Sequence, residues 1–167
     1  MSDLYLSGYL FESLEDGIGV RTVLFFSGCD HNCKDCHSKN THSFTNGESV
    51  TDELIEFINK EIRKRPYLSG ITLSGGDPLY SAKNIYYLLD KLYIPNNDIW
   101  LYTGFTIDDI VKSKDIYVHK LTNSCSHIVD GLFEVEKRDI SSSCKYRGST
   151  NQKIYKNIGK DKWVECK

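Results

Sequence analysis

Four short segments, each rich in β-branched and aromatic residues and each ending at a glycine, constrain the fold more than any other feature. They are residues 19–28, 70–76, 98–104 and 126–131. Short apolar runs that stop at glycine are typical of buried strands. A helical pattern lies between each of these segments and the next. Strands that alternate with helices predict βαβ units and a parallel sheet with right-handed crossovers.

The helical patterns carry recognisable start signals. Thr51 is expected to cap a helix that runs to about Arg65, and Ser81 is expected to cap a second one. Thr106 and Asp109 fit a capping box that opens a short third helix. The first two helices have apolar residues at helical spacing: Leu54, Ile55, Ile58 and Ile62, then Ile85, Leu88, Leu89 and Leu92.

Length and composition bound the class of protein. The 167 residues fit one domain, residues 1–167, and a net charge of −2 supplies no basic field for nucleic acid. The first residues show no basic leader with an apolar core, and no apolar run approaches the roughly 20 residues of a membrane span. We therefore expect a cytoplasmic protein that binds neither nucleic acid nor membrane.

Three of the six cysteines lie in one loop directly after the first predicted strand. Cys29, Cys33 and Cys36 have the spacing C-x3-C-x2-C. In a reducing cytosol, clustered cysteines more often bind metal or do redox work than form structural disulfides. The loop and the segments "SGGDP", "YTG" and "VDG" all follow predicted strand ends. Ligand sites of α/β sheets lie beyond the carboxyl ends of strands, so we expect these segments to meet there.

Three chemistries compete for the three thiols. A structural zinc site would take a histidine as its fourth ligand, from His31, His37 or His42. A redox dithiol, Cys33 with Cys36, leaves the first cysteine without a role. A [4Fe–4S] cluster normally takes four thiolates, so three would leave one iron open to a substrate or cofactor. Three further cysteines are candidates for a fourth ligand, although none has a partner at short spacing: Cys125, Cys144 and Cys166.

The cysteine spacing, followed one strand later by the glycine-rich "SGGDP" of residues 74–78, resembles the radical S-adenosylmethionine (SAM) superfamily. The longer stretch "DGIGVRTVLFFSGCDHNCKDCHS" resembles the glycyl-radical-enzyme activases. Four further motifs occur in the order found in one branch of these activases, the activating proteins of anaerobic ribonucleoside-triphosphate reductase: "SGGDPL", "DIWLYTG", "VDGLFE" and "YRGSTNQKIY". Together the motifs span residues 16–155.

The resemblance implies an α/β fold, a partial (β/α) barrel of the radical SAM type with a parallel sheet and outer helices. A full barrel usually takes about 200 residues or more, and an open mouth suits a macromolecular substrate. It implies an oxidoreductase that uses a [4Fe–4S] cluster and SAM to generate a 5′-deoxyadenosyl radical. That radical would install a glycyl radical on the large subunit of the anaerobic (class III) reductase.

The resemblance also assigns residues and partners. Cys29, Cys33 and Cys36 would be the catalytic cluster ligands, and the last of them would also adjoin SAM. The remaining SAM contacts would be Asp35, His37, Gly75, Gly76 and Asp77. An electron donor such as flavodoxin is implied, together with a homodimer within a heterotetramer. The alternatives are an activase of another glycyl radical enzyme such as pyruvate formate-lyase, a small metabolite enzyme of the carboxy-deazaguanine synthase type, and a non-catalytic zinc module.

Two positions depart from the family pattern, and several keep open roles. Ile18 replaces a proline in a turn, and Ser38 replaces an asparagine that commonly lies beside the SAM. Arg21 is expected either to contact a partner or to cap a strand. Asp130 is equally compatible with two roles, polar support at the rim of the site and a simple turn residue. In "YRGSTNQ", two residues are expected to hold the C-terminal tail or form a partner surface: Arg147 and Asn151.

Overall fold

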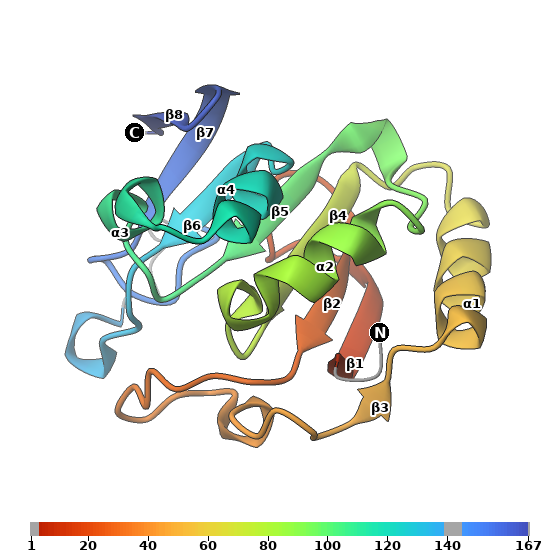
Figure 1. Ribbon diagram of the computed structural model, residues 1–167, viewed down its shortest axis with the longest axis horizontal. Helices are drawn as coiled ribbons and strands as arrows, with labels where there is room; N and C mark the ends of the chain where they lie inside the picture. The colour runs from red at the N-terminus through yellow and green to blue at the C-terminus, as the bar shows by residue number, and fades with distance from the viewer. Residues whose placement is uncertain (1–3, 139–144, 167) are drawn as a thin grey trace.

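The computed structural model describes residues 4–138 and 145–166. One eight-stranded mixed sheet forms the centre of the molecule, in the order β3-β1-β2-β4-β5-β6-β7-β8 (Figure 1). The strands are β1 (Tyr5–Ser13), β2 (Arg21–Phe26), β3 (Glu48–Ser49), β4 (Gly70–Gly75), β5 (Ile99–Tyr102), β6 (His127–Asp130), β7 (Lys153–Gly159) and β8 (Lys162–Glu165).

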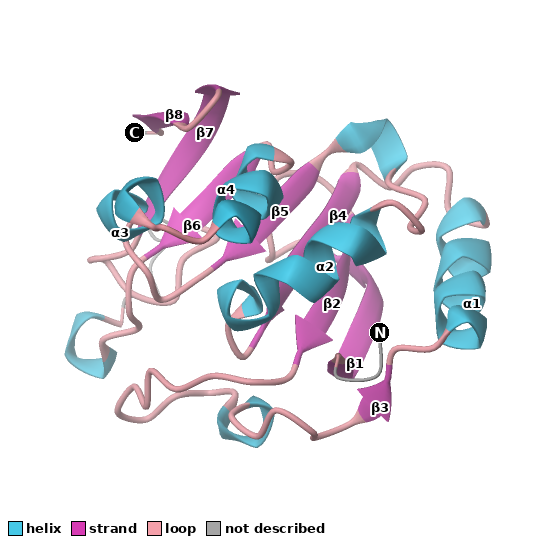
Figure 2. Cartoon of the chain, viewed as in Figure 1, coloured by secondary structure: helices cyan, strands magenta, loops and turns pink. Residues whose placement is uncertain are grey.

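The described residues include four α-helices and four 3₁₀ turns. The helices are α1 (Asp52–Arg63), α2 (Ala82–Leu89), α3 (Ile107–Lys112) and α4 (Ile116–Asn123). The 3₁₀ turns are η1 (Lys39–Thr41), η2 (Pro78–Ser81), η3 (Pro95–Asn97) and η4 (Val135–Lys137). In Figure 2, α2 and α4 lie across the same side of the sheet. No helix in the part of the chain that is described is long and apolar enough to span a membrane.

The predicted fold class is wrong. Only the central strands β2, β4, β5 and β6 pair in parallel, whereas β1, β3, β7 and β8 pair antiparallel. The sheet is therefore mixed and open, and the chain is rich in strands and has few helices, rather than forming a partial (β/α) barrel with outer helices. The flanking strands escaped prediction because most of their residues are half-buried or exposed and polar residues interrupt the apolar ones, as in the β7 sequence "KIYKNIG". Such strands lack the apolar runs that identified the central four.

The helix start signals had mixed outcomes. Thr51 caps α1, where its hydroxyl accepts a hydrogen bond from the Leu54 N–H, and Thr106 and Asp109 form the predicted capping box. The prediction for Ser81 is wrong, because its side chain makes no capping bond. A 3₁₀ turn precedes α2 instead and is capped by the carboxylate of Asp77.

The two faces of the parallel strands differ in character. On one face, alternate residues such as Leu24, Leu73 and Leu101 join the helices in a continuous apolar core. On the other face, Arg21 is completely buried and donates five hydrogen bonds, at 2.7–3.1 Å, to oxygens of Ile18, Ile71, Thr72 and Asp98. All guanidinium donors are thereby used. Arg21 therefore ties the amino ends of the strands together and forms no part of a partner surface.

Candidate iron–sulfur site

The segment from Ser27 to Gly47, hereafter the cysteine loop, leaves the carboxyl end of β2 and has little regular structure. Backbone hydrogen bonds nevertheless fasten its start. The Ser27 N–H donates to the Tyr5 carbonyl at 3.0 Å, and the Gly28 N–H donates to the Thr41 carbonyl at 2.7 Å. Backbone hydrogen bonding thus joins the two ends of the loop, and the cysteines lie in the segment between them.

All three thiols are half-buried, and Cys36 accepts a hydrogen bond from the N–H of Ser38 at 3.4 Å. The backbone N–H of His31 acts to lower the pKa of Cys29, and that of Phe133, which follows β6, acts to lower the pKa of Cys33. Backbone N–H groups aimed at sulfur favour the thiolate form, which is the form that ligates metal.

Burial opposes ionisation of two of these thiols, Cys29 and Cys33. Burial raises the pKa of Cys29 to about 11, against the smaller effect of its backbone donor, and burial also raises the pKa of Cys33. Burial therefore favours the protonated form of Cys29 and Cys33, and a metal that these two thiols ligate must displace their protons. Within the described residues, no three His, Cys, Asp or Glu side chains converge on one point that could hold a single ion.

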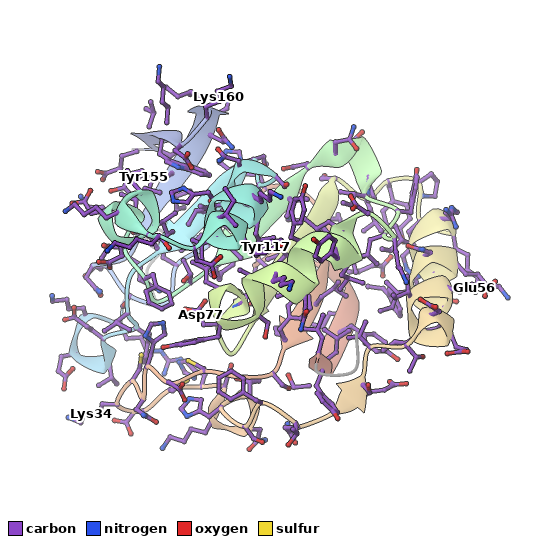
Figure 3. The ribbon with its side chains drawn as sticks, in the orientation of Figure 1. Lys34, Glu56, Asp77, Tyr117, Tyr155 and Lys160 are labelled. Carbon is purple, nitrogen blue, oxygen red and sulfur yellow. The ribbon has the colours of Figure 1, made fainter. Side chains whose placement is uncertain are left out.

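Asp77 connects the cysteine loop to the sheet. Its buried carboxylate accepts hydrogen bonds from His31 Nε2 at 2.7 Å, Thr103 Oγ1 at 2.8 Å and the N–H of Gly104 at 2.9 Å. The N–H of Leu79 donates to its second oxygen at 2.9 Å. In Figure 3, Asp77 lies between the end of the sheet and the loop that carries Lys34. The carboxylate thus joins the ends of β4 and β5 to the loop.

The two glycines after β4 allow the cysteine loop to approach the sheet. Gly75 has φ +107°, and a Cβ there would lie 2.4 Å from the carbonyl oxygen of Phe26. A Cβ on Gly76 would lie 2.5 Å from the carbonyl oxygen of Gly28 and 2.9 Å from that of Thr41. The close approach of the chain's own backbone therefore requires glycine at both positions, independently of any ligand.

A cavity of about 340 Å³ opens beside the thiols, at the carboxyl ends of the parallel strands. This is within the usual size of a small-molecule site. Six of the eight predicted site residues line it: Cys29, Cys33, Cys36, His37, Gly75 and Gly76. Asp35 is exposed and Asp77 is buried, and both lie outside the lining.

Several residues of the site were not predicted individually. Asp16, Tyr102, Phe133 and Gln152 line the cavity, and the ring of Phe133 packs against His37 with 5.2 Å between centroids. All four belong to motifs already noticed: Asp16 opens "DGIGVRTVLFFSGCDHNCKDCHS", and the others lie in "YTG", "VDGLFE" and "YRGSTNQ". The motifs marked the right segments, but no pattern in the sequence showed which side chains face inward.

The other candidate residues lie away from the thiols. Cys125 is buried in the apolar core, where its thiol donates to the Leu121 carbonyl at 3.2 Å and burial raises its pKa. Cys166 is exposed, and Cys144 lies outside the described residues. Asp130 is buried and accepts from the N–H groups of Ile107 and Lys153, so it supports the rim.

Comparison with known proteins identifies the class of this site. A family model described as a 4Fe-4S single cluster domain matches residues 15–155, which include the cysteine loop and every segment around the cavity. The site is therefore that of an iron–sulfur protein, and an iron–sulfur cluster is its cofactor.

Curated relatives identify the family more closely. An anaerobic ribonucleoside-triphosphate reductase-activating protein of Enterobacteria phage T4 is 34% identical over 85% of this chain and 87% of its own. Proteins of the same name from Vibrio cholerae and Escherichia coli K12 are each 35% identical over 84% of this chain and 90% of their own. The chain belongs to the family of anaerobic ribonucleoside-triphosphate reductase-activating proteins.

Proposed function

We propose that this chain is a SAM-dependent activase that installs a glycyl radical on an anaerobic ribonucleoside-triphosphate reductase. The names of the relatives support the activating role and its target. The observation that carries the chemistry is the set of three half-buried thiols that line one cavity at the strand ends. Three protein ligands leave one iron of a cubane free for SAM.

The residues present fit the two groups. Cys29, Cys33 and Cys36 would hold the [4Fe–4S] cluster, and the cavity beside them would take SAM. Bound together, the two groups would supply one-electron chemistry, the reductive cleavage of the SAM sulfonium bond to methionine and a radical able to take a hydrogen atom from a glycine. The protein supplies position and exclusion of water.

The other predicted SAM contacts differ in where they lie relative to the cavity. His37 lines the cavity next to the last cysteine and would contact SAM, with the ring of Phe133 packed against its own at a tilt of 56°. Gly75 and Gly76 would present backbone to the methionine end of SAM. Asp35 is exposed and would approach SAM from the outer side of the loop. Asp77 already accepts four hydrogen bonds, so it would act on SAM through the position of the loop.

The wider setting follows from the same proposal. The chain would act as one domain, residues 1–167, in the cytoplasm. Its large partner would be the reductase subunit that bears the glycine, and a flavodoxin-like protein would donate the electron. A homodimer within a heterotetramer with the reductase would place both sites of the pair against their substrates.

Release of 5′-deoxyadenosine tests the proposal directly. The protein is reconstituted anaerobically with iron and sulfide, reduced, and given SAM with and without a reductase from an organism that encodes a close relative. We expect 5′-deoxyadenosine in proportion to cluster content, and a glycyl radical signal in the reductase by electron paramagnetic resonance. A colourless protein with stoichiometric zinc, or a full cluster that never cleaves SAM even with the reductase present, would contradict it.

A further inference from the structure

The chain on both sides of Cys29 is held by one residue of the glycine motif, Asp77. Before the cysteine, the Asp77 N–H donates to the carbonyl oxygen of Gly28 at 2.9 Å. After it, the Asp77 carboxylate accepts a hydrogen bond from His31 Nε2 at 2.7 Å. Residues 28–31, hereafter the Cys29 segment, are therefore fixed to the end of β4 through both the backbone and the side chain of Asp77.

The ring of His31 occupies a built position on the sheet. Its centroid lies 4.7 Å from that of Phe105 and 5.3 Å from that of Tyr80. A Cβ on Gly104 would lie 2.6 Å from His31 Cδ2, so the ring rests directly against the turn that follows β5. Only 13% of the His31 side chain is accessible. The surrounding rings and the turn thus hold the imidazole where its Nε2 reaches Asp77.

The contact between His31 and Asp77 is shielded from water and involves a charged acceptor. The side chain of Asp77 is 1% accessible. Hydrogen bonds to an ionised group are stronger than those between neutral groups, and a low local dielectric strengthens them further. Of the four hydrogen bonds that the described residues donate to this carboxylate, the one from His31 comes from the cysteine loop. His31 is therefore the side chain through which the loop is held at this carboxylate.

The same contact lies between the two proposed cofactor positions. Cys29, His31, Gly75 and Gly76 all line the cavity, and Asp77 directly follows the second glycine. Cys29 would bind one iron of the cluster, and the glycines would present backbone to the methionine end of SAM. The distance between these two positions is therefore set where the Cys29 segment joins Asp77.

We infer that His31 is a positioning residue: its hydrogen bond to Asp77 holds the Cys29 segment against the glycine motif, so that the cluster and SAM meet in one fixed geometry. The inference rests on the proposed function. Without the His31 donor, three thiols remain to hold a cluster, but the cluster and the glycine motif are no longer fixed to each other. SAM would then have to order them as it binds, which weakens its affinity.

Three variants separate the hydrogen bond from the packing of the ring. His31→Phe keeps an aromatic ring and removes the donor, and His31→Leu serves if that variant does not fold. His31→Gln removes the ring but keeps an amide N–H in place of Nε2. His119→Phe is the matched control, because His119 Nδ1 also contacts a carboxylate, that of Asp161 at 3.0 Å, and His119 lies outside the cavity lining.

Hydrogen exchange of the metal-free full-length protein at one pH tests the contact without any cofactor. The Cys29 N–H donates to the His42 carbonyl at 3.1 Å, so its exchange reports opening of the Cys29 segment. In His31→Phe, mass spectrometry should show exchange in the peptide containing Cys29 that is faster by about tenfold or more, the range for one hydrogen bond to a charged group. His31→Gln should restore most of the protection, and the control should match the unaltered protein.

SAM affinity then tests the consequence for the cofactors. The proteins are reconstituted anaerobically to equal iron and sulfide content, and SAM binding is measured by equilibrium dialysis. We expect the dissociation constant of SAM to rise about tenfold in His31→Phe and to remain near the unaltered value in His31→Gln and in the control.

The outcomes distinguish this inference from the proposed function. An unaltered protein that binds no cluster or no SAM contradicts the proposed function, whatever the exchange rates show. Exchange in His31→Phe at the unaltered rate overturns the role of the hydrogen bond. Opening that is as large in His31→Gln as in His31→Phe overturns it too, because packing of the ring would then explain the effect. Faster exchange with unchanged SAM affinity overturns the positioning of the cluster against SAM.

Discussion

The cysteine loop and the β7–β8 hairpin are held in place in opposite ways. The hairpin has a regular ladder, yet it is largely exposed, with Ile158 60% and Val164 51% accessible. The cysteine loop has almost no ladder, but its anchors, such as Ser27, Thr41 and the facing Asp77, are buried. Regular structure thus distributes the hairpin's stability over many weak bonds, whereas the loop depends on a few buried polar contacts, so single substitutions should affect it far more.

The largest expected effect concerns the thiols of the loop. Replacing Cys29, Cys33 or Cys36 by alanine should reduce SAM cleavage to background, because an iron loses its ligand. Cys125→Ala and Cys166→Ala should retain cleavage, measured as 5′-deoxyadenosine per cluster. Loss of the cluster in the Cys125 variant would show that the site takes a fourth protein ligand.

Removal of the buried anchor comes next. Asp77→Ala leaves His31, Thr103 and two backbone N–H groups without their acceptor, so we expect a loss on the order of 3 kcal/mol in the free energy of unfolding. Urea denaturation of the metal-free protein measures it. The exposed Asp90 provides the control, since Asp90→Ala should change stability by less than about 0.5 kcal/mol. Equal effects at both positions would contradict the anchoring role.

A smaller loss is expected where the loop packs on the sheet. Gly76→Ala places a methyl group against the carbonyls of Gly28 and Thr41, and overpacking of this kind costs about 1–3 kcal/mol. Gly8→Ala in β1 is the matched change, because nothing lies within 4 Å of a Cβ there. Thermal unfolding of both variants should separate them, with reduced iron uptake only in the Gly76 variant.

The hairpin should show the smallest effect, and it should depend on pH. His119 faces the Ser113 carbonyl at 2.8 Å and Asp161, in the β7–β8 turn, at 3.0 Å, with Asp115 nearby; the carbonyl bond and then the Asp161 carboxylate raise its pKa. Because the pKa of His119 is higher in the folded than in the unfolded protein, protonation of His119 stabilises the fold. This stabilisation is complete below about pH 6.5 and is lost as pH rises through the folded-state pKa.

His119→Gln should remove this dependence and cost about 0.5 kcal/mol at acidic pH, as surface ion pairs do. Urea unfolding of the variant and the unaltered protein from pH 5 to 9 measures the difference. If the variant keeps the same pH dependence of the free energy of unfolding, that dependence comes from other groups.

The sequence predicted the central strands because burial on both faces leaves a continuous apolar run, as in "RTVLFF" of β2. It did not predict β1, β7 and β8, since their residues mix apolar with polar ones at the sheet's flanks. The barrel prediction failed for that reason: four parallel strands were found and the antiparallel strands that complete the sheet were not.

For the site, the spacing of Cys29, Cys33 and Cys36 and the order of the glycine motifs located the cavity. They did not indicate the contacts across the loop. Asp77 was expected against a ligand, but its carboxylate contacts His31 and Thr103. Contacts between side chains distant in sequence depend on the register of β4 against β5, and a single sequence holds no direct record of that register.

The late position of one cavity wall has a consequence for how the protein is made. Gln152, which lines the cavity beside the thiols, is synthesised about 116 residues after Cys36, which at ordinary rates of translation is roughly 6–23 s later. During that interval the nascent cysteine loop lacks part of the surface that surrounds it in the folded protein. An iron–sulfur cluster delivered to the growing chain would meet an incomplete ligand environment, so cluster delivery suits the finished chain better than the ribosome-bound one.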